Sequence, residues 1–289
     1  MKTYLVKEAD LAGISQDALA TMEIGTKFNH HGLCLEFTDG GVTMTEAQII
    51  VDVANISLSV KVRGGPNIRL LKEIPSHVLF DILNKYREQS KSTYTYTGVL
   101  YIPFTRPNLG VLVDPSALVL GMLDIETYQL QVKFADVVLL CDKVTVAPEI
   151  DKGPARPLGE HIRFERWERT HDAVGIDNVT VLPHGEPNTA MLGYHIHDAA
   201  AGTVRDVEVR FDGQIIHDPL TKYQNDLLLH RAGRTPVANY FHVDFNRWGS
   251  CLPVGIAKSF RQKIYWSAAP AGYDIYTEMV YNLGAKNYS

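Results

Sequence analysis

The stretch "VEVRFDGQIIHDP", from Val207 to Pro219, has a relative much earlier in the same chain. "VKVRGGPNIRLLKEIP", from Val60 to Pro75, has the same frame: Val, charge, Val, Arg, a glycine-containing turn, an apolar return and then Pro. The two stretches start about half of the 289-residue chain apart. This spacing predicts an internal duplication of a strand–turn–strand unit.

The turns in the two stretches indicate hairpins. Asp212-Gly213 is a favoured two-residue hairpin dipeptide, because both central positions of such a turn need positive φ. The stretch Gly64-Gly65-Pro66-Asn67 supplies a longer turn in the first copy. Each half therefore contains two antiparallel strands joined by a tight connection.

A short helix is expected after each hairpin. A Pro precedes a hydroxyl residue that can cap a helix, Ser76 in the first half and Thr221 in the second. The apolar residues that follow repeat at helical spacing and predict the packed face of each helix. They are Val78, Leu79, Ile82, Leu83 and Tyr86 in the first half and, less regularly, Tyr223, Leu227 and Leu228 in the second.

The rest of the chain favours strands and divides at a proline-rich segment. Ile49 to Arg63 is rich in β-branched residues and predicts one long bent strand or two short ones. The segment "VAPEIDKGPARPLGEH" has linker composition. We therefore predict an all-β chain with a leading arm at 1–24 that contains a weakly helical "SQDALATM", a first unit at 25–147, a linker at 148–159 and a second unit at 160–289.

Composition limits the classes of function. Apolar residues make up 45% and charged residues 21%, so the chain can bury a core. A net charge of −5 gives no basic face for nucleic acid. Cys34, Cys141 and Cys251 are sparse and contain no Cys-x-x-Cys, which favours folding in a reducing compartment. No apolar stretch is long enough to predict a membrane span.

Candidate chemistry is sparse. His195 and His197 share a strand face at a spacing that suits a metal, but no Glu ligand follows Asp198, so two partly exposed strand histidines are expected. Glu165 and Glu168 fall on opposite faces of a strand, among arginines that favour surface ion pairs. No phosphate loop, dinucleotide fingerprint or nucleophile elbow occurs. We assign no catalytic, cofactor-binding or metal-ligating residue and expect no cofactor.

The arrangement of these features resembles the double jelly-roll major capsid proteins of tailless icosahedral viruses, especially bacteriophages with an internal membrane. The first half carries the resemblance in "GVTMTEAQIIVDV", "VKVRGG…LLKEIPSHVLFDILNKY", "YIPFTRP" and "LDIETYQLQVKF". The second half carries it in "LGEHIRFERWERT", "TVLPHGEP", "VEVRFDGQII" and "YFHVDFNR". The match covers nearly the whole chain from about Gly25.

The resemblance implies two tandem eight-stranded jelly rolls, each with a short helix inserted in a connection. It implies a non-enzymatic major capsid protein, made in the host cytoplasm and located in the virion shell. Three subunits would form a pseudo-hexameric trimer that contacts neighbouring capsomers. Minor capsid or vertex proteins and an internal viral membrane are further candidate partners, with 1–24 as a candidate contact arm, whereas direct nucleic-acid binding is not expected.

Two alternatives stay open at this point. One is a jelly-roll metal-dependent or sugar-acting enzyme that uses His195 and His197. The other is a viral carbohydrate-binding or minor structural β-sandwich protein, in which Trp167, Trp248 and Trp266 would stack on sugars.

Overall fold

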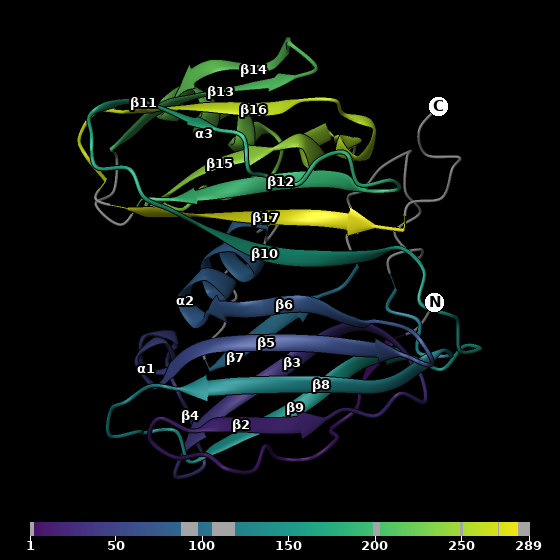
Figure 1. The fold of residues 1–289 in the computed structure, drawn as a ribbon. Helices are drawn as coiled ribbons and strands as arrows, with labels where there is room; N and C mark the ends of the chain where they lie inside the picture. Colours follow the sequence, from purple (N-terminus) through teal and green to yellow (C-terminus); the bar gives the residue numbers. More distant parts are fainter. Residues whose placement is uncertain are drawn as a thin grey trace. The chain divides into compact units, whose positions relative to one another are not determined.

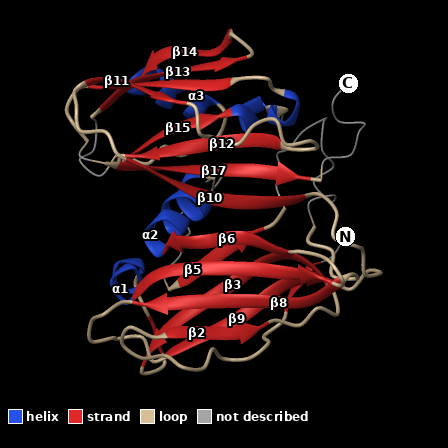
Figure 2. Cartoon of the chain, in the orientation of Figure 1, coloured by secondary structure: helices blue, strands red, loops and turns tan. Residues whose placement is uncertain are grey.

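The computed structural model shows a chain built mostly of strands, with few and short helices (Figure 1, Figure 2). Its described residues form two compact units: unit 1 contains those up to residue 162, and unit 2 contains those from residue 163 onward. The structure describes residues 3–87, 98–105, 119–198, 203–248, 251–270 and 272–282.

Unit 1 is a pair of antiparallel sheets. The first sheet has the order β1 (Thr3–Leu5), β9 (Lys143–Asp151), β3 (Asn29–Asp39), β7 (Val99–Pro103), and the short β4 (Val42–Thr43) also pairs with β3. The second sheet has the order β2 (Leu19–Glu23), β8 (Ile125–Phe134), β5 (Val53–Val62), β6 (Asn67–Pro75). Its helices are α1 (Glu46–Asp52) and α2 (Ser76–Leu79), which continues as a π-helix over Phe80–Tyr86.

Unit 2 is also a pair of antiparallel sheets. One has the order β10 (His161–Arg169), β17 (Tyr273–Tyr281), β12 (Ala190–His197), β15 (Tyr240–Asp244). The other has the order β11 (Gly175–Val179), β16 (Phe260–Trp266), β13 (Val204–Phe211), β14 (Gln214–Thr221). Helix α3 spans Lys222–Arg231, and two 3₁₀ helices span Phe245–Trp248 and Val254–Ile256.

The two units share one topology. If β4 is set aside, the described residues of each unit form eight strands in chain order, arranged as 1-8-3-6 in one sheet and 2-7-4-5 in the other. In both units a helix lies between the fifth and sixth strands. This is the jelly-roll arrangement of two facing sheets, so the predicted tandem jelly rolls are confirmed. The two related sequence stretches form the fourth and fifth strands of each unit.

The second hairpin has the predicted turn. Asp212 and Gly213 adopt φ values of 47° and 84°, as a type I′ turn requires. The Asp212 carboxylate accepts hydrogen bonds from the backbone N–H groups of Lys258 and Ser259, each at 2.8 Å, which holds the turn against the start of β16. Pro219 lies within β14, where it is tolerated because β14 is an edge strand.

The first predicted helix packs as expected, but the second does not. All five residues of the first stripe are buried. In α3, Tyr223 is 89% exposed and Leu227 is 61% exposed, so the predicted packed face is wrong. The buried residues of α3 are Asn225 and Leu229, one helical turn apart. Asn225 takes a core position because its side-chain amide donates a 2.7 Å hydrogen bond to the backbone carbonyl of His242.

The two predicted helix caps have different outcomes. Thr221 caps α3 in a reciprocal capping box with Gln224, as predicted. Ser76 does not cap α2: the N-cap residue is Pro75, and the Ser76 hydroxyl instead donates a 2.6 Å hydrogen bond to the carbonyl of Val53. The buried β5 carbonyl therefore takes the hydroxyl that was expected to cap the helix.

Three segments differ from the sequence prediction in secondary structure. The stretch expected to be a strand from Ile49 begins as α1, whose capping box joins Thr45 and Gln48, and β5 begins only at Val53. The weakly helical stretch of the leading arm contains β2, because its residues pair with β8. Strands β1 and β2 belong to unit 1, and β9 runs into the predicted linker as far as Asp151. No helix within the described ranges is long and apolar enough to cross a membrane.

Candidate functional site

The two candidate metal histidines lie on the same face of β12, as predicted, but in different surroundings. His195 has 0% exposure, so its expected partial exposure is wrong. His197 is partly buried, and its ring packs against Tyr240 with centroids 4.9 Å apart. Strand register places His242 of β15 on one side of His195 and Tyr276 of β17 on the other.

His195 belongs to a chain of buried hydrogen bonds. Its Nδ1 lies 2.7 Å from Nδ1 of His242, and its Nε2 lies 3.1 Å from a carboxylate oxygen of Glu278. The backbone N–H of Val237 donates to Nε2 of His242 at 3.1 Å. The side chains of His195, His242 and Glu278 are fully buried. Within the described part of the chain, no group of three or more His, Cys, Asp or Glu residues is placed to hold a metal.

The carboxylates of β10 are not paired for acid–base chemistry. Glu165 accepts a 3.2 Å hydrogen bond from the hydroxyl of Tyr281, while Glu168 lies 3.2 Å from the guanidinium of Arg166. Arg166 also pairs with Asp274 at 3.0 Å. The expected surface ion pairing is confirmed for Arg166, which pairs with Glu168 and Asp274. Glu165 and Glu168 therefore have separate partners.

A polar pocket of about 680 Å³ lies beside these ion pairs in unit 2. Arg169 pairs with Asp177 at 3.2 Å, and the hydroxyl of Tyr273 donates to the same carboxylate at 2.6 Å. Burial, and then the hydrogen bond to Asp177, raise the pKa of Tyr273 far above its ordinary value, so its hydroxyl stays protonated as a donor. The charged side chains of the pocket wall are therefore paired with one another. The lining residues are Arg166, Glu168, Arg169, Thr170, His197, Gly272, Tyr273 and Asp274.

The tryptophans do not form a sugar-stacking platform in the described residues. Trp266 is buried in the unit 2 core, and Trp167 packs against that core while its indole N–H donates to Thr277 at 3.2 Å. The side chain of Trp248 lies outside the described residues. The two described indoles therefore serve packing.

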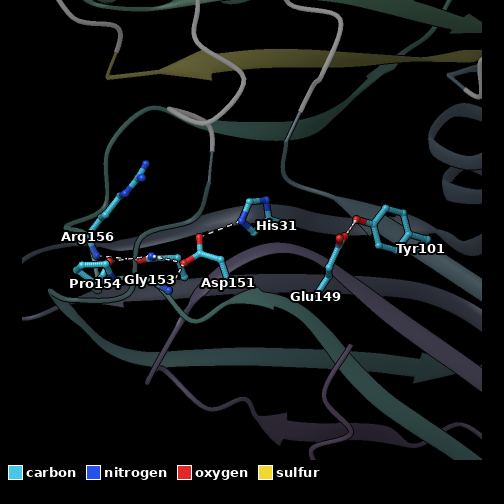
Figure 3. A network of polar contacts seen from close by, with 8 residues as sticks. His31, Tyr101, Glu149, Asp151, Gly153, Pro154 and Arg156 are labelled. Atoms are coloured by element: carbon cyan, nitrogen blue, oxygen red, sulfur yellow. Dashed lines mark hydrogen bonds and ion pairs between the residues drawn. The ribbon is translucent and has the colours of Figure 1, made fainter. Parts of the chain in front are cut away.

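In unit 1, a polar network holds the chain where it leaves β9 (Figure 3). The carboxylate of Asp151, 1% exposed, accepts hydrogen bonds from His31 Nε2 at 3.0 Å, from Asn29 at 3.2 Å and from the backbone N–H of Gly153 at 2.8 Å. Asn29 also accepts from the backbone N–H of Arg156 at 2.8 Å. The first residues of the predicted linker are therefore tied to β3.

The charge on Asp151 is maintained by these donors. Burial raises the pKa of Asp151, but the hydrogen bonds from His31, Gly153 and Asn29 lower it by more, and the net result is a pKa below its ordinary value. Further along β9, the carboxylate of Glu149 accepts from the hydroxyl of Tyr101 (Figure 3). Sequence reasoning missed this network because Asn29 and Asp151 are more than a hundred residues apart.

A second pocket, of about 670 Å³, lies beside the first turn of α3 in unit 2. Its lining includes Pro236, Val237 and Ala238, the segment that leads into β15, and Lys222 and Tyr223 of α3. Lys222 pairs with Asp226 at 3.2 Å and donates to the carbonyl of Tyr240 at 2.8 Å. The position of the 236–238 segment therefore shapes this pocket.

The fold is that of known double jelly-roll structures. The major capsid protein P2 from bacteriophage PM2 is similar over 98% of this chain and 99% of its own, with a TM-score of 0.78 and 17% sequence identity. The Sulfolobus Turreted Icosahedral Virus structure is similar over 96% and 91%, with a TM-score of 0.65 and 9% identity. The PBCV-1 virus capsid model is similar over 97% and 94%, with a TM-score of 0.60 and 11% identity.

The sequence itself supplies the narrower assignment. Residues 163–283 match the family model described as the viral coat protein P2 C-terminal domain, which covers most of unit 2. No curated protein matches the chain. The resemblance to double jelly-roll coat proteins is thereby confirmed: the chain has their fold, and residues 163–283 match a coat-protein domain.

Proposed function

We propose that the chain is the major capsid protein of an icosahedral virion and that it assembles as a homotrimer with a pseudo-hexameric outline. The observation that carries this proposal is the shared topology of the two units, together with the coat-protein match over residues 163–283. Three copies of a chain with two like units present six like units around one axis. A trimer with six like units can contact six neighbouring trimers through similar edges. A trimer of chains with one unit each has three such edges.

Exposed apolar side chains of unit 2 support self-association. Tyr223 and Leu227 lie one helical turn apart on α3 and are largely exposed, and Ile215 and Ile216 on the edge strand β14 are also exposed. Contacts between subunits bury such residues, and aromatic side chains are enriched in them. An exposed edge strand with apolar residues is also a surface on which proteins risk aggregation unless it is covered.

Native mass spectrometry of the purified chain tests the trimer. A metal-free species near 97 kDa, three times the 32.3 kDa of one chain, supports the proposal. A stable monomer at micromolar concentration contradicts it. The double variant Tyr223→Ser, Leu227→Ser tests whether α3 contributes, with His230→Gln on the same helix as the control because this side chain is also exposed.

A separate imaging experiment distinguishes the capsid role from oligomerisation alone. Chain expressed with its viral context, or concentrated in assembly buffer, is expected to form closed shells or sheets of hexagonally packed tiles in electron micrographs. A trimer that forms neither, under conditions in which whole virions are stable, would contradict the capsid role while leaving the trimer intact.

A further inference from the structure

The hydrogen-bond chain in unit 2 fixes the proton positions of two buried histidines. Nε2 of His242 accepts from the backbone N–H of Val237, so this nitrogen carries no proton. A neutral His242 must then carry its proton on Nδ1, from which it donates across 2.7 Å to Nδ1 of His195. His195 accepts there, so its own proton lies on Nε2 and is donated to Glu278 across 3.1 Å.

The result is a one-way chain of donors that runs from Val237 through His242 and His195 to Glu278. Each imidazole is neutral, and each uses one nitrogen as donor and the other as acceptor. If either ring gains a proton, two N–H groups face each other, either at the 2.7 Å contact or at the contact with Val237. A buried pair of facing donors is unfavourable because neither N–H group then points at an acceptor across that contact.

We propose that this series of hydrogen bonds acts as an acid-sensitive latch. It holds residues 235–238 against β15 at neutral pH and releases them when the imidazole of His195 or His242 becomes protonated. The inference concerns unit 2 alone and does not depend on the trimer. The bond from Val237 to His242 is the member of the chain that joins the segment to the sheet. Its loss therefore acts locally before the unit as a whole unfolds.

The flanks of the segment are held by contacts that do not involve histidine. On one side Arg234 pairs with Asp244 at 2.8 Å in a fully buried ion pair. On the other, the carbonyl of Asn239 accepts a 2.8 Å hydrogen bond from the backbone N–H of Asp198. The carbonyl of Val237 also accepts a 3.1 Å hydrogen bond from the backbone N–H of Tyr240. Protonation thus frees the N–H side of Val237, while this carbonyl and both ends of the segment stay attached. Because Pro236, Val237 and Ala238 line the pocket beside α3, release changes the shape of that pocket.

Other titratable groups share this face of the sheet. On β12 it is His197, on β15 Tyr240 and Asp244, and on β17 Asp274 and Tyr276, which donates to Asp274 at 3.2 Å. The residue that α3 directs at β15 is the uncharged Asn225. Within the described part of unit 2, Asp244 and Asp274 are each paired with an arginine. Nε2 of the buried His217 lies 3.4 Å from the side-chain oxygen of Asn225. Glu278 and His217 are therefore the two groups whose protonation must be separated from that of His195 and His242.

The direction of the pH effect follows from proton binding. The latched state excludes an extra proton on either imidazole, whereas a solvated imidazole takes one up below a pKa of about 6.5. The latched state therefore binds fewer protons than the released state, so latching is favoured at high pH and is lost as the pH falls below about 6.5. If opening takes up one proton, its equilibrium constant increases up to tenfold for each unit by which the pH falls. The increase is roughly 30-fold between pH 6.5 and pH 5.

Hydrogen exchange of the full chain, read by mass spectrometry at pH 7.5 and pH 5, measures this opening. Each rate is divided by the intrinsic exchange rate at the same pH. We expect the protection of 236–240 to fall by roughly 30-fold at pH 5, while the β13–β16 sheet keeps its protection. The double variant His195→Gln, His242→Gln removes both imidazoles and should show the same protection at both pH values. His230→Gln, at an exposed histidine, should respond as the parent does.

Two further measurements keep the proposal testable if the double variant does not fold. Glu278→Gln retains an acceptor for His195, so its acid response should persist, and loss of the response would assign the sensor to Glu278 and overturn the proposal. Nitrogen-15 NMR of the imidazoles at pH 7.5 should show a neutral His242 protonated on Nδ1 and a neutral His195 protonated on Nε2. A positively charged His195 at that pH would also overturn it.

Discussion

The turn at Gly213 offers a direct test of how the duplicated hairpin is specified. Gly213 adopts φ of +84°, and a Cβ atom added there would have no heavy atom within 4 Å. A substitution at this position therefore changes the backbone preference without causing a clash. Its neighbour Asp212 remains tied by two hydrogen bonds to Lys258 and Ser259, just before β16, so the turn cannot easily move to another conformation.

The expected magnitude comes from the left-handed backbone region alone. A residue with a Cβ loses roughly 1–2 kcal/mol there relative to a right-handed conformation, and a β-branched residue loses more. Gly213→Val should therefore lower the free energy of unfolding of unit 2 by about 2 kcal/mol, and Gly213→Ala by about 1 kcal/mol. Gly213→Asn should have the smallest effect, because Asn tolerates positive φ.

Chemical denaturation followed by circular dichroism and tryptophan fluorescence measures this series. Gln214→Val is the matched control, because it places the same side chain at an adjacent exposed position that has no positive φ. The control should be close to the parent. If Gly213→Val unfolds at the same denaturant concentration as the parent, or if Asn at 213 is worse than Val, the reasoning from the turn is refuted.

Three further changes address separate features. Thr221→Ala removes the capping box of α3 and should lower the free energy of unfolding by about 1 kcal/mol in thermal denaturation. An unchanged melting temperature would show that the cap is dispensable. Asp52→Ala leaves two backbone N–H groups of the loop at 140–141 without their carboxylate and should destabilise unit 1 by roughly 3 kcal/mol in urea. Asp151, with its lowered pKa, contributes stability at neutral pH that is lost as the pH falls below about 3.8, so Asp151→Asn should approach the parent in acid.

Much of the fold could be predicted because it depends on local signals that occur twice. The Asp212-Gly213 dipeptide fixes one hairpin, and the apolar spacing of residues 78–86 fixes one packed helix. The miss at residues 46–52 had a local signal too: Thr45 followed by Gln48 is a capping box that marks a helix start. The β-branched residues Ile49, Ile50, Val51 and Val53 follow this signal and favour a strand instead.

The candidate site could not be predicted in the same way, since its partners are distant in sequence. His195 and His197 were recognised as a pair, but the contacts of His195 are with His242 and Glu278, on neighbouring strands. The buried side of α3 was missed because Asn225 occupies it, and a polar residue carries no apolar pattern. Only the strand register, which brings β12 between β15 and β17, makes these polar residues mutual partners.

The two units therefore keep a common topology while their buried chemistry differs. Topology depends on alternation and on a few turn positions, and these tolerate substitution as long as apolar residues stay on the inner faces. The helix of unit 1 packs through an apolar stripe, whereas α3 packs through Asn225 and a hydrogen bond to β15. In the proposed trimer, the six units would thus be alike in outline but of two chemical kinds. An acid response confined to unit 2 would then act on alternate positions around the tile and leave the unit 1 positions unchanged.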